Sequence, residues 1–200
     1  MKAIWDYVVK PKGERYNNVK KIGDKELILN SEISNHEFIN REGIVKETPL
    51  GFESIIEKGD VVILHHNVFR RWYNQAGEEK NSSGFINEDT YIVSPDQIFA
   101  YTKNRKCEKC WRPMPGYCFI KPLKENHKLN PMEKEKLMGV VKFSDGTIEE
   151  GSLVGFRIVG QYEFVIDGQR LYRVKSNLIT LKYEYQGNEE EYNPSWAKSS

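Results

Sequence analysis

Four short sequence blocks in the first half of the chain recur, in the same order, in the second half. The blocks, each given with its later copy, are Val8–Pro11 and Phe119–Pro122, Gly43–Lys46 and Gly139–Lys142, Glu57–Val62 and Glu149–Val154, and Tyr91–Val93 and Tyr172–Val174. The offset between the copies falls from 111 through 96 and 92 to 81, so the copies differ by deletions between the blocks, where a duplicated domain carries its loops. The pattern predicts two similar small domains in tandem.

The length of 200 residues suits two domains of roughly ninety to a hundred residues each. We place the first domain at residues 1–101 and the second, shorter one at 116–185. Residues 102–115, rich in Lys, Arg and Pro, are expected to link them. The polar end of the chain, residues 186–200, is expected to be disordered.

The repeated blocks predict β-structure. They are rich in Val, Ile, Tyr and Phe, are short, and are bounded by Gly, Pro, Asn or Asp, whereas helical spacing of apolar residues is hard to find. Small all-β domains usually close into a barrel or a sandwich, which removes exposed strand edges. We therefore expect an all-β protein made of two small β-barrels.

Turn residues support this organisation. Gly59-Asp60 and Gly151-Ser152 each follow charged residues and precede an apolar run, which is typical of a tight turn leading into a strand. Asp167-Gly168 lies between two apolar runs and predicts a β-hairpin. In the first half, a longer polar stretch, residues 74–84, takes the place of that turn.

The composition of the chain indicates which classes of partner and which compartment to expect. Thirty basic and twenty-nine acidic residues give a net charge of +1, so nucleic acid and anionic membranes are unlikely partners. The sequence contains neither an apolar run of about twenty residues nor a signal-peptide core at its start. Three cysteines do not make a disulfide framework, and we expect a soluble, cytoplasmic protein in a reducing compartment.

A long polar loop distinguishes the first half from the second. Thirty-one residues, 12–42, separate Pro11 from Gly43, but only sixteen separate Pro122 from Gly139. Loops of that length without regular structure tend to be functional or disordered. Within this loop, polar flanks enclose one apolar triplet, Leu27–Leu29, which is expected to be a binding element. The alternative is that the triplet forms another buried strand of the barrel.

The first half resembles a co-chaperonin of the GroES family. Ile4–Lys10 resembles the first strand of that family, the loop with its aliphatic triplet resembles the mobile loop, and Gly43–Val45 resembles the strand after the loop. Lys58–Ile63 resembles the KxGDxV signature, and Tyr91–Val93 with Asp96–Ile98 resembles the closing strands. The resemblance covers residues 1–101, with a weaker echo through 116–182. It implies two GroES-like β-barrels, the first with a mobile loop.

That resemblance implies capping, without a cofactor or chemistry of its own. Family members form rings whose loops dock into an apolar groove of a GroEL-type chaperonin and close a chamber for non-native protein substrates, driven by ATP hydrolysis on the chaperonin. The implied chaperonin-binding residues are Leu27, Ile28 and Leu29. Ring subunits of the family pair their first and last strands, which here implies an oligomer interface of Ala3, Ile4 and Trp5 on one chain with Leu178, Ile179 and Leu181 on the next.

The chain departs from the family pattern at three places. Lys25-Glu26 stands where the family has Gly-Gly before the triplet. Residues 46–58 are too short for the roof hairpin of bacterial members, which makes the chain more similar to the lids of T4-type bacteriophages. The short loop of the second copy has no aliphatic triplet. We therefore expect the second domain not to engage the chaperonin.

Two other groups of residues indicate different functions. Cys107 and Cys110 have the spacing of half a zinc site, which Cys118 and His127 would complete, but Cys118 falls in an expected strand and is more typical of a core residue. Residues 68–73 interleave aromatic and basic side chains, as in a single-strand nucleic-acid platform or a phage structural and assembly module built on a repeated barrel.

Nothing in the sequence supports an enzyme, because it contains no nucleophile motif, no phosphate loop and no carboxylate pair near a histidine. His65 and His66 are adjacent, so on a strand they would face opposite sides.

Overall fold

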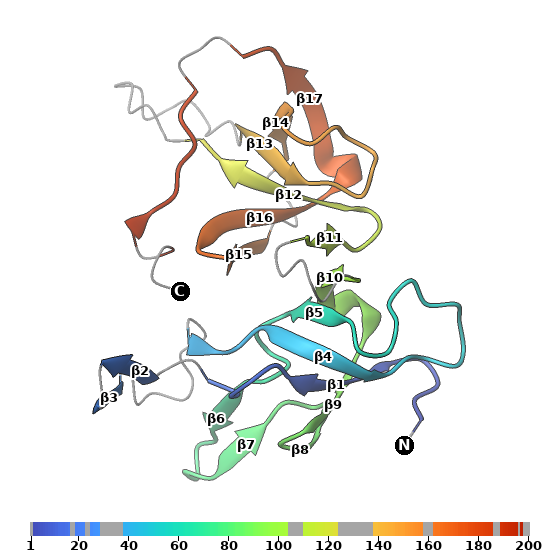
Figure 1. The fold of residues 1–200 in the computed structure, drawn as a ribbon, viewed down its shortest axis with the longest axis vertical. Helices are drawn as coiled ribbons and strands as arrows, with labels where there is room; N and C mark the ends of the chain where they lie inside the picture. The colour runs from blue at the N-terminus through green and yellow to red at the C-terminus, as the bar shows by residue number, and fades with distance from the viewer. Residues whose placement is uncertain are drawn as a thin grey trace. The chain divides into compact units, whose positions relative to one another are not determined.

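The computed structural model describes residues 2–16, 19–22, 25–28, 38–103, 110–123, 138–157, 162–185, 189–195 and 197, with residues 19–22 and 25–28 described at the level of the backbone. The chain divides into two compact units, Met1–Cys110 and Trp111–Ser200 (Figure 1). Apart from short 3-10 turns, every regular element among the described residues is a β-strand. The predicted all-β class is confirmed. None of the helical turns described is long and apolar enough to cross a membrane.

The first unit has one main sheet and two small hairpins. Its strands are β1 (Tyr7–Pro11), β2 (Val19–Ile22), β3 (Lys25–Ile28), β4 (Glu42–Glu47), β5 (Val61–Leu64), β6 (Arg71–Tyr73), β7 (Glu79–Asn81), β8 (Phe85–Asn87), β9 (Thr90–Val93) and β10 (Ile98–Thr102). In the main sheet they follow the order β10-β5-β4-β1-β9-β8, with every pair antiparallel. The pairs β2-β3 and β6-β7 each form a separate two-stranded sheet.

The second unit repeats this order. Its strands are β11 (Arg112–Pro113), β12 (Tyr117–Pro122), β13 (Met138–Phe143), β14 (Leu153–Phe156), β15 (Tyr162–Ile166), β16 (Gln169–Lys175) and β17 (Ile179–Tyr183). The strands β12 to β17 form one sheet in the order β17-β14-β13-β12-β16-β15. Element by element, this matches β10-β5-β4-β1-β9-β8 of the first unit.

The match extends to single residue pairs. In the first unit β1 faces β4 with Val9 opposite Val45 and a bulge between Val8 and Val9. In the second, β12 faces β13 with Ile120 opposite Val141 and a bulge between Phe119 and Ile120. The ladders β1-β9 and β12-β16 correspond, as do β4-β5 and β13-β14, and β5-β10 and β14-β17 also share a bulge. The repeated blocks therefore occupy equivalent places in the two sheets.

The two Gly-led turns also repeat. Gly59 has φ 92° and Gly151 has φ 85°, a region in which a side chain would be strained. The Gly59 amide donates to Val45 O over 2.8 Å, and the Gly151 amide donates to Val141 O over 2.7 Å. The tight turns predicted at both positions are confirmed. A 3-10 turn then precedes the last strand of each unit, η2 (Pro95–Gln97) and η3 (Ser176–Leu178).

Crowding explains the glycine that opens two of the repeated blocks. A Cβ atom on Gly43 would lie 2.5 Å from Val9 Cγ1, and one on Gly139 would lie 2.5 Å from Ile120 Cγ2. Both sites are therefore too close to the neighbouring strand for a side chain. The neighbours belong to the two cores, since Val9 and Ile120 are each fully buried.

The barrels expected from the sequence are confirmed only as β-sheets. Among the described residues, neither sheet order returns to its first strand. The β15-β16 hairpin is confirmed, because Ile166 pairs with Gln169 around Asp167-Gly168, and both turn residues have positive φ, 49° and 68°.

The second unit begins earlier than residue 116. Trp111 was expected in the linker, yet it is buried and its indole Nε1 donates to Asp167 Oδ2 of the second unit over 3.0 Å. Arg112–Pro113 forms β11. Burial of a large aromatic side chain with its N–H satisfied explains why this part of the expected linker is ordered.

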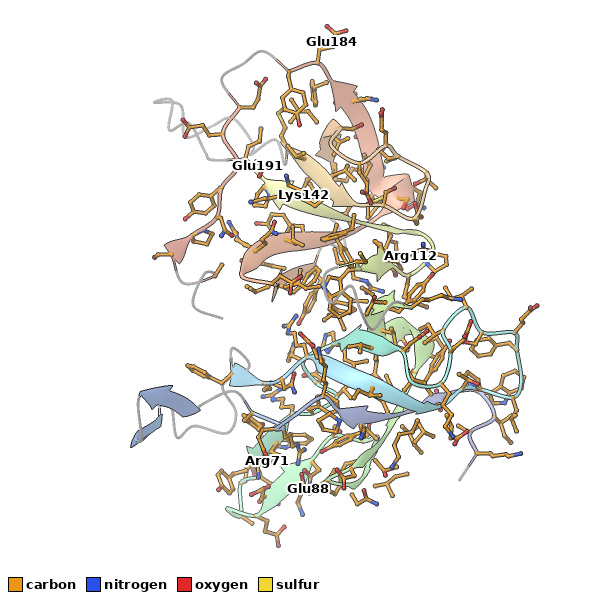
Figure 2. All side chains as sticks on the ribbon, viewed as in Figure 1. Arg71, Glu88, Arg112, Lys142, Glu184 and Glu191 are labelled. Carbon is orange, nitrogen blue, oxygen red and sulfur yellow. The ribbon has the colours of Figure 1, made fainter. Side chains whose placement is uncertain are left out.

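The polar tail also differs from the expectation of disorder. Glu191 pairs with Leu123 in an isolated β-bridge, and its carboxylate contacts Lys121 (3.1 Å) and Lys142. Figure 2 labels Glu191 and Lys142 beside each other. Asn193 donates from its amide to Gly168 O over 3.0 Å, and Ala197 is fully buried. These groups fix residues 189–195 and 197 on the second unit, so the expected disorder does not hold for the described part of the tail.

Candidate functional site

The base of the long loop is closed by paired main chain. The Lys12 amide donates to Glu42 O over 2.9 Å, the Asn40 amide donates to Arg15 O over 3.1 Å, and Tyr16 forms a bridge with Ile39. The two arms of the loop therefore leave the sheet as an antiparallel stem. This stem, residues 12–16 and 38–42, continues the ladder between β1 and β4.

Asn40 locks the stem from inside. It is 5% exposed, and its amide nitrogen donates to Lys12 O over 3.0 Å and to Glu14 O over 2.8 Å. Its amide oxygen accepts from the Glu42 amide over 2.9 Å. One buried side chain thus satisfies main-chain groups on both arms, and such a group is costly to leave unpaired when buried.

Arg15 ties the stem to the segment that follows β5. Its side chain is 7% exposed. Nε donates to Phe69 O over 2.7 Å, while Nη2 donates to Arg70 O over 3.2 Å and to Asn81 Oδ1 over 2.6 Å. The guanidinium also lies 5.2 Å from the ring centre of Phe85 and 5.5 Å from that of Tyr91. This is the buried use of arginine as a planar donor fork.

Two further contacts widen this anchor. The Tyr16 hydroxyl accepts from the Arg71 amide over 2.8 Å, and the Arg71 guanidinium lies 4.9 Å from the Tyr16 ring centre. On the other side, Glu88 lies 3.5 Å from Arg15 Nη1, but it is 70% exposed and adds little. Figure 2 labels Arg71 and Glu88 at the edge of the first unit that holds β6, β7 and β8. The long loop and the inserted segment 65–84, which lies between β5 and β8, are therefore held together.

This junction joins the two places where the first unit is longer than the second. The first insertion is the long loop, and the second lies between β5 and β9, where the offset between copies falls from 92 to 81. Sequence reasoning missed Arg15 and Asn40. The available signal was that both residues lie within four positions of the strands that flank the loop. The neighbouring sequence does not indicate that their side chains are buried.

The loop carries a hairpin of its own. β2 and β3 pair with Val19 opposite Ile28 and Lys20 opposite Leu27. Neither strand pairs with the main sheet among the described residues. Of the predicted chaperonin-binding residues, Leu27 and Ile28 lie in β3, and Leu29 lies outside the described residues. β3 pairs with β2 among the described residues, and the alternative, in which Leu27, Ile28 and Leu29 form another buried strand of the barrel, stays a prediction.

The predicted interface residues at the start of the chain are exposed. Ile4 is 61% and Trp5 is 64% exposed, and Leu50 beside them is 65% exposed. The segment is nevertheless fixed, because the Leu50 amide donates to Ala3 O over 3.1 Å and the Gly51 amide donates to Ile4 O over 2.7 Å. Trp5 also packs so closely on Gly51 that a Cβ there would lie 2.6 Å from its ring. An ordered, exposed apolar patch results.

The predicted interface residues of the second unit divide into two kinds. Leu178 and Ile179 are partly buried and pack on the core around Ile120 and Val154. Leu181 is 55% exposed, on β17, which pairs only with β14 among the described strands. Only Leu181 and the outer edge of β17 are thus open for contact with another chain.

The described residues do not assemble a metal site. They contain no group of three or more His, Cys, Asp or Glu side chains close enough to hold an ion. Cys107 and His127 lie outside the described residues, and Cys110 is disulfide-bonded. Cys118 is buried in β12, as its predicted strand position indicated, with its sulfur 3.5 Å from Ser176 Oγ and 3.8 Å from Asp145 Oδ1.

The two adjacent histidines do not face opposite sides. They follow β5 in a turn, and their rings stack with centres 4.3 Å apart. His65 Nδ1 accepts from the Asn67 amide over 3.1 Å. The centre of the His65 ring lies 5.8 Å from the centre of the Phe99 ring. The strand assumption behind the prediction was wrong, since β5 ends at Leu64.

Comparison with known protein families finds no family that matches the chain, and comparison with curated proteins finds no matching relative.

Proposed function

We propose that the protein is a co-chaperonin-like lid built from two GroES-like domains, which caps a GroEL-type chaperonin through the loop of its first unit. The observation that carries the proposal is the β2-β3 hairpin, which forms its own sheet beyond a stem locked by Asn40 and Arg15. This arrangement presents the segment of Leu27 and Ile28 apart from the core of the unit. A binding element needs that separation.

The free energies of binding favour a hairpin over a loop without secondary structure as the binding element. Burial of three aliphatic side chains would contribute about 5 to 8 kcal/mol, at about 1.5 to 3 kcal/mol each. Ordering a free chain costs about 1 to 2 kcal/mol per residue, which would consume most of that gain. A paired hairpin on a fixed stem has already lost part of this freedom, so binding costs less. One loop still binds weakly, and several loops in a ring bind with avidity.

Ring assembly has two exposed elements to use. The patch of Ile4, Trp5 and Leu50 presents apolar surface, and β17 presents an unpaired strand edge with Leu181. Unpaired edges are templates for pairing with another chain. We propose that these elements meet between neighbouring copies. The shorter second unit, which lacks the long loop, would then contribute to the ring and not to chaperonin binding.

The test of chaperonin binding is a pair of substitutions on facing residues of the hairpin. Leu27→Asp is expected to abolish binding to a GroEL-type chaperonin in the presence of ATP, because a carboxylate would have to enter an apolar groove. Lys20→Asp, at the position opposite Leu27, introduces the same acidic group without removing an aliphatic one. It is expected to retain binding within a few-fold.

Binding is measured by calorimetry or by retention on immobilised chaperonin, and the size of each variant is checked by gel filtration. Equal binding by Leu27→Asp and the parent protein would reject the anchor role. Equal loss in both variants would mean that charge, and not the aliphatic contact, governs the interaction.

A further inference from the structure

A cavity of about 370 Å³ opens on the first unit beside the Arg15 junction, within the size range of small-ligand sites. Its polar lining comes from Asn67, Arg70, Ser82, Ser83 and Gln97. Its apolar lining comes from Val68, Trp72 and Ile92. No lining residue is acidic, and Arg70 is the only charged one.

Arg70 lacks the partners that a half-buried guanidinium normally has. Its Nε is buried, and no acceptor among the described residues lies within hydrogen-bond distance. No ion pair joins Arg70 to a carboxylate in the part of the chain that the structure describes, and its closest aromatic contact is Trp72, with the guanidinium carbon 5.9 Å from the ring centre. Arg70 lines the cavity without a carboxylate partner among the described residues and without an acidic neighbour in the lining, so its guanidinium can donate to an anion that enters there.

The cavity is held in shape by its surroundings. The Arg15 side chain bonds the carbonyls of Phe69 and Arg70, which fixes the main chain that carries the Arg70 side chain. The Ser82 hydroxyl donates to Val68 O over 2.6 Å, and the Gly84 carbonyl accepts from the Ile92 amide over 2.7 Å. The walls are therefore joined to one another, and the site exists before any ligand enters.

We propose that this cavity binds a small ligand that joins one oxyanion, a carboxylate or a phosphate, to a compact apolar or aromatic body. Arg70 donates to the oxyanion, for which its planar fork is suited. The amide and hydroxyl groups of the lining supply further donors, and Trp72, Val68 and Ile92 contact the body. The site is independent of the chaperonin-binding hairpin, so either proposal can fail alone.

The test uses the full chain and three aromatic probes titrated by calorimetry. Benzoate carries the carboxylate, phenyl phosphate carries the phosphate, and benzyl alcohol has the same body without charge. Saturable binding of either anion, at least tenfold tighter than the alcohol, supports the site, and the tighter of the two identifies the source of the oxyanion. Equal binding of all three probes would overturn the proposal.

Two variants assign the binding to this cavity. Arg70→Gln is expected to weaken the anion about tenfold to a hundredfold, the range for loss of a charged hydrogen bond. Arg112→Gln removes the same charge from the second unit and is expected to leave affinity unchanged. Ser83→Leu fills the cavity from an exposed position and should also weaken binding if Arg70→Gln fails to fold. Full affinity in a folded Arg70→Gln or in Ser83→Leu would refute the site.

Discussion

Arg15 is the residue on which the first unit depends most. Its guanidinium satisfies two carbonyls and one side-chain oxygen from the inserted segment, and it contacts the rings of Phe85 and Tyr91. Those partners lie more than fifty residues away in the sequence, so no local pattern around Arg15 could reveal them. A basic residue in a polar loop is read as solvated until the fold is known.

We expect Arg15→Met to destabilise the first unit by about 2 to 4 kcal/mol, because it leaves buried acceptors unpaired. Arg15→Lys should recover less than half of that loss, since one ammonium group cannot reproduce three donors in a plane. Both are measured by denaturant unfolding with Arg112→Gln as the charge-matched control. Parent-like stability of Arg15→Lys would show that the fork geometry is unimportant.

At Tyr91, unlike at Arg15, we expect that removing the polar group does not lower the stability of the protein. It is fully buried, its hydroxyl has no hydrogen-bond partner among the described residues, and burial raises the pKa of its phenol to about 12. Because the folded pKa exceeds the ordinary value of 10.0, stability from the neutral phenol is complete below pH 10 and is lost as pH rises toward 12.

Tyr91→Phe removes an unsatisfied hydroxyl, so at pH 7 it should leave stability unchanged or raise it by up to about 1 kcal/mol. Above pH 10 the variant should lose stability less steeply than the parent. Unfolding midpoints measured from pH 7 to 11.5 test both expectations. A loss of 2 kcal/mol or more at pH 7 would mean that the hydroxyl has a partner.

Among the elements, the strands were readable from sequence and the hairpin inside the loop was not. The blocks around Val9, Val45 and Val62 are apolar and short, and their copies fall at equivalent places in the second sheet. β2 reads Val-Lys-Lys-Ile and β3 reads Lys-Glu-Leu-Ile, so polar and apolar residues do not alternate, which weakens the strand signal. The hint was the Gly23-Asp24 pair between two runs of equal length.

For the tail, the acidic composition led to an expectation of disorder, yet its described part is attached to the second unit. Burial acts to raise the pKa of the Glu191 carboxyl, but hydrogen bonds from Lys142 and Lys121 outweigh that effect and hold the pKa below its ordinary value of 4.5. The attachment is therefore fully present above about pH 5 and is lost as pH falls below 4.5.

We expect the tail to detach under acid while the second sheet remains folded. Hydrogen exchange at the Tyr192 amide, which donates to Pro122 O, should accelerate below pH 4.5 relative to that of the core amides. Glu191→Gln should show the faster exchange already at pH 7, with a stability change of about 1 kcal/mol or less. Protection at pH 7 that is unchanged in Glu191→Gln would assign the attachment to Asn193 and Ala197 instead.

At the scale of the whole molecule, one ancestral sheet accounts for both units. The same strand order, the same two bulges and the same Gly-led turn would be hard to obtain independently. The units differ where the first unit carries the long loop and the segment around β6 and β7. Because Arg15 joins these two additions, we infer that they were retained together as one functional region.

The lid proposal predicts a change in molecular mass that a solitary binding module would not show. The full chain alone should scatter light as an oligomer, because one loop binds too weakly to cap a chaperonin. Substitution of the exposed patch, Trp5→Glu, should reduce that mass without unfolding either sheet, since Trp5 is 64% exposed. An unchanged mass would remove this patch from the interface.

Capping through the β2-β3 hairpin can be measured by the light-scattering mass of the full chain mixed with a GroEL-type chaperonin, with and without ATP. We expect a larger complex with ATP, formed by the parent and by Lys20→Asp and not by Leu27→Asp. A parent protein that stays monomeric and apart from the chaperonin in every condition would contradict it.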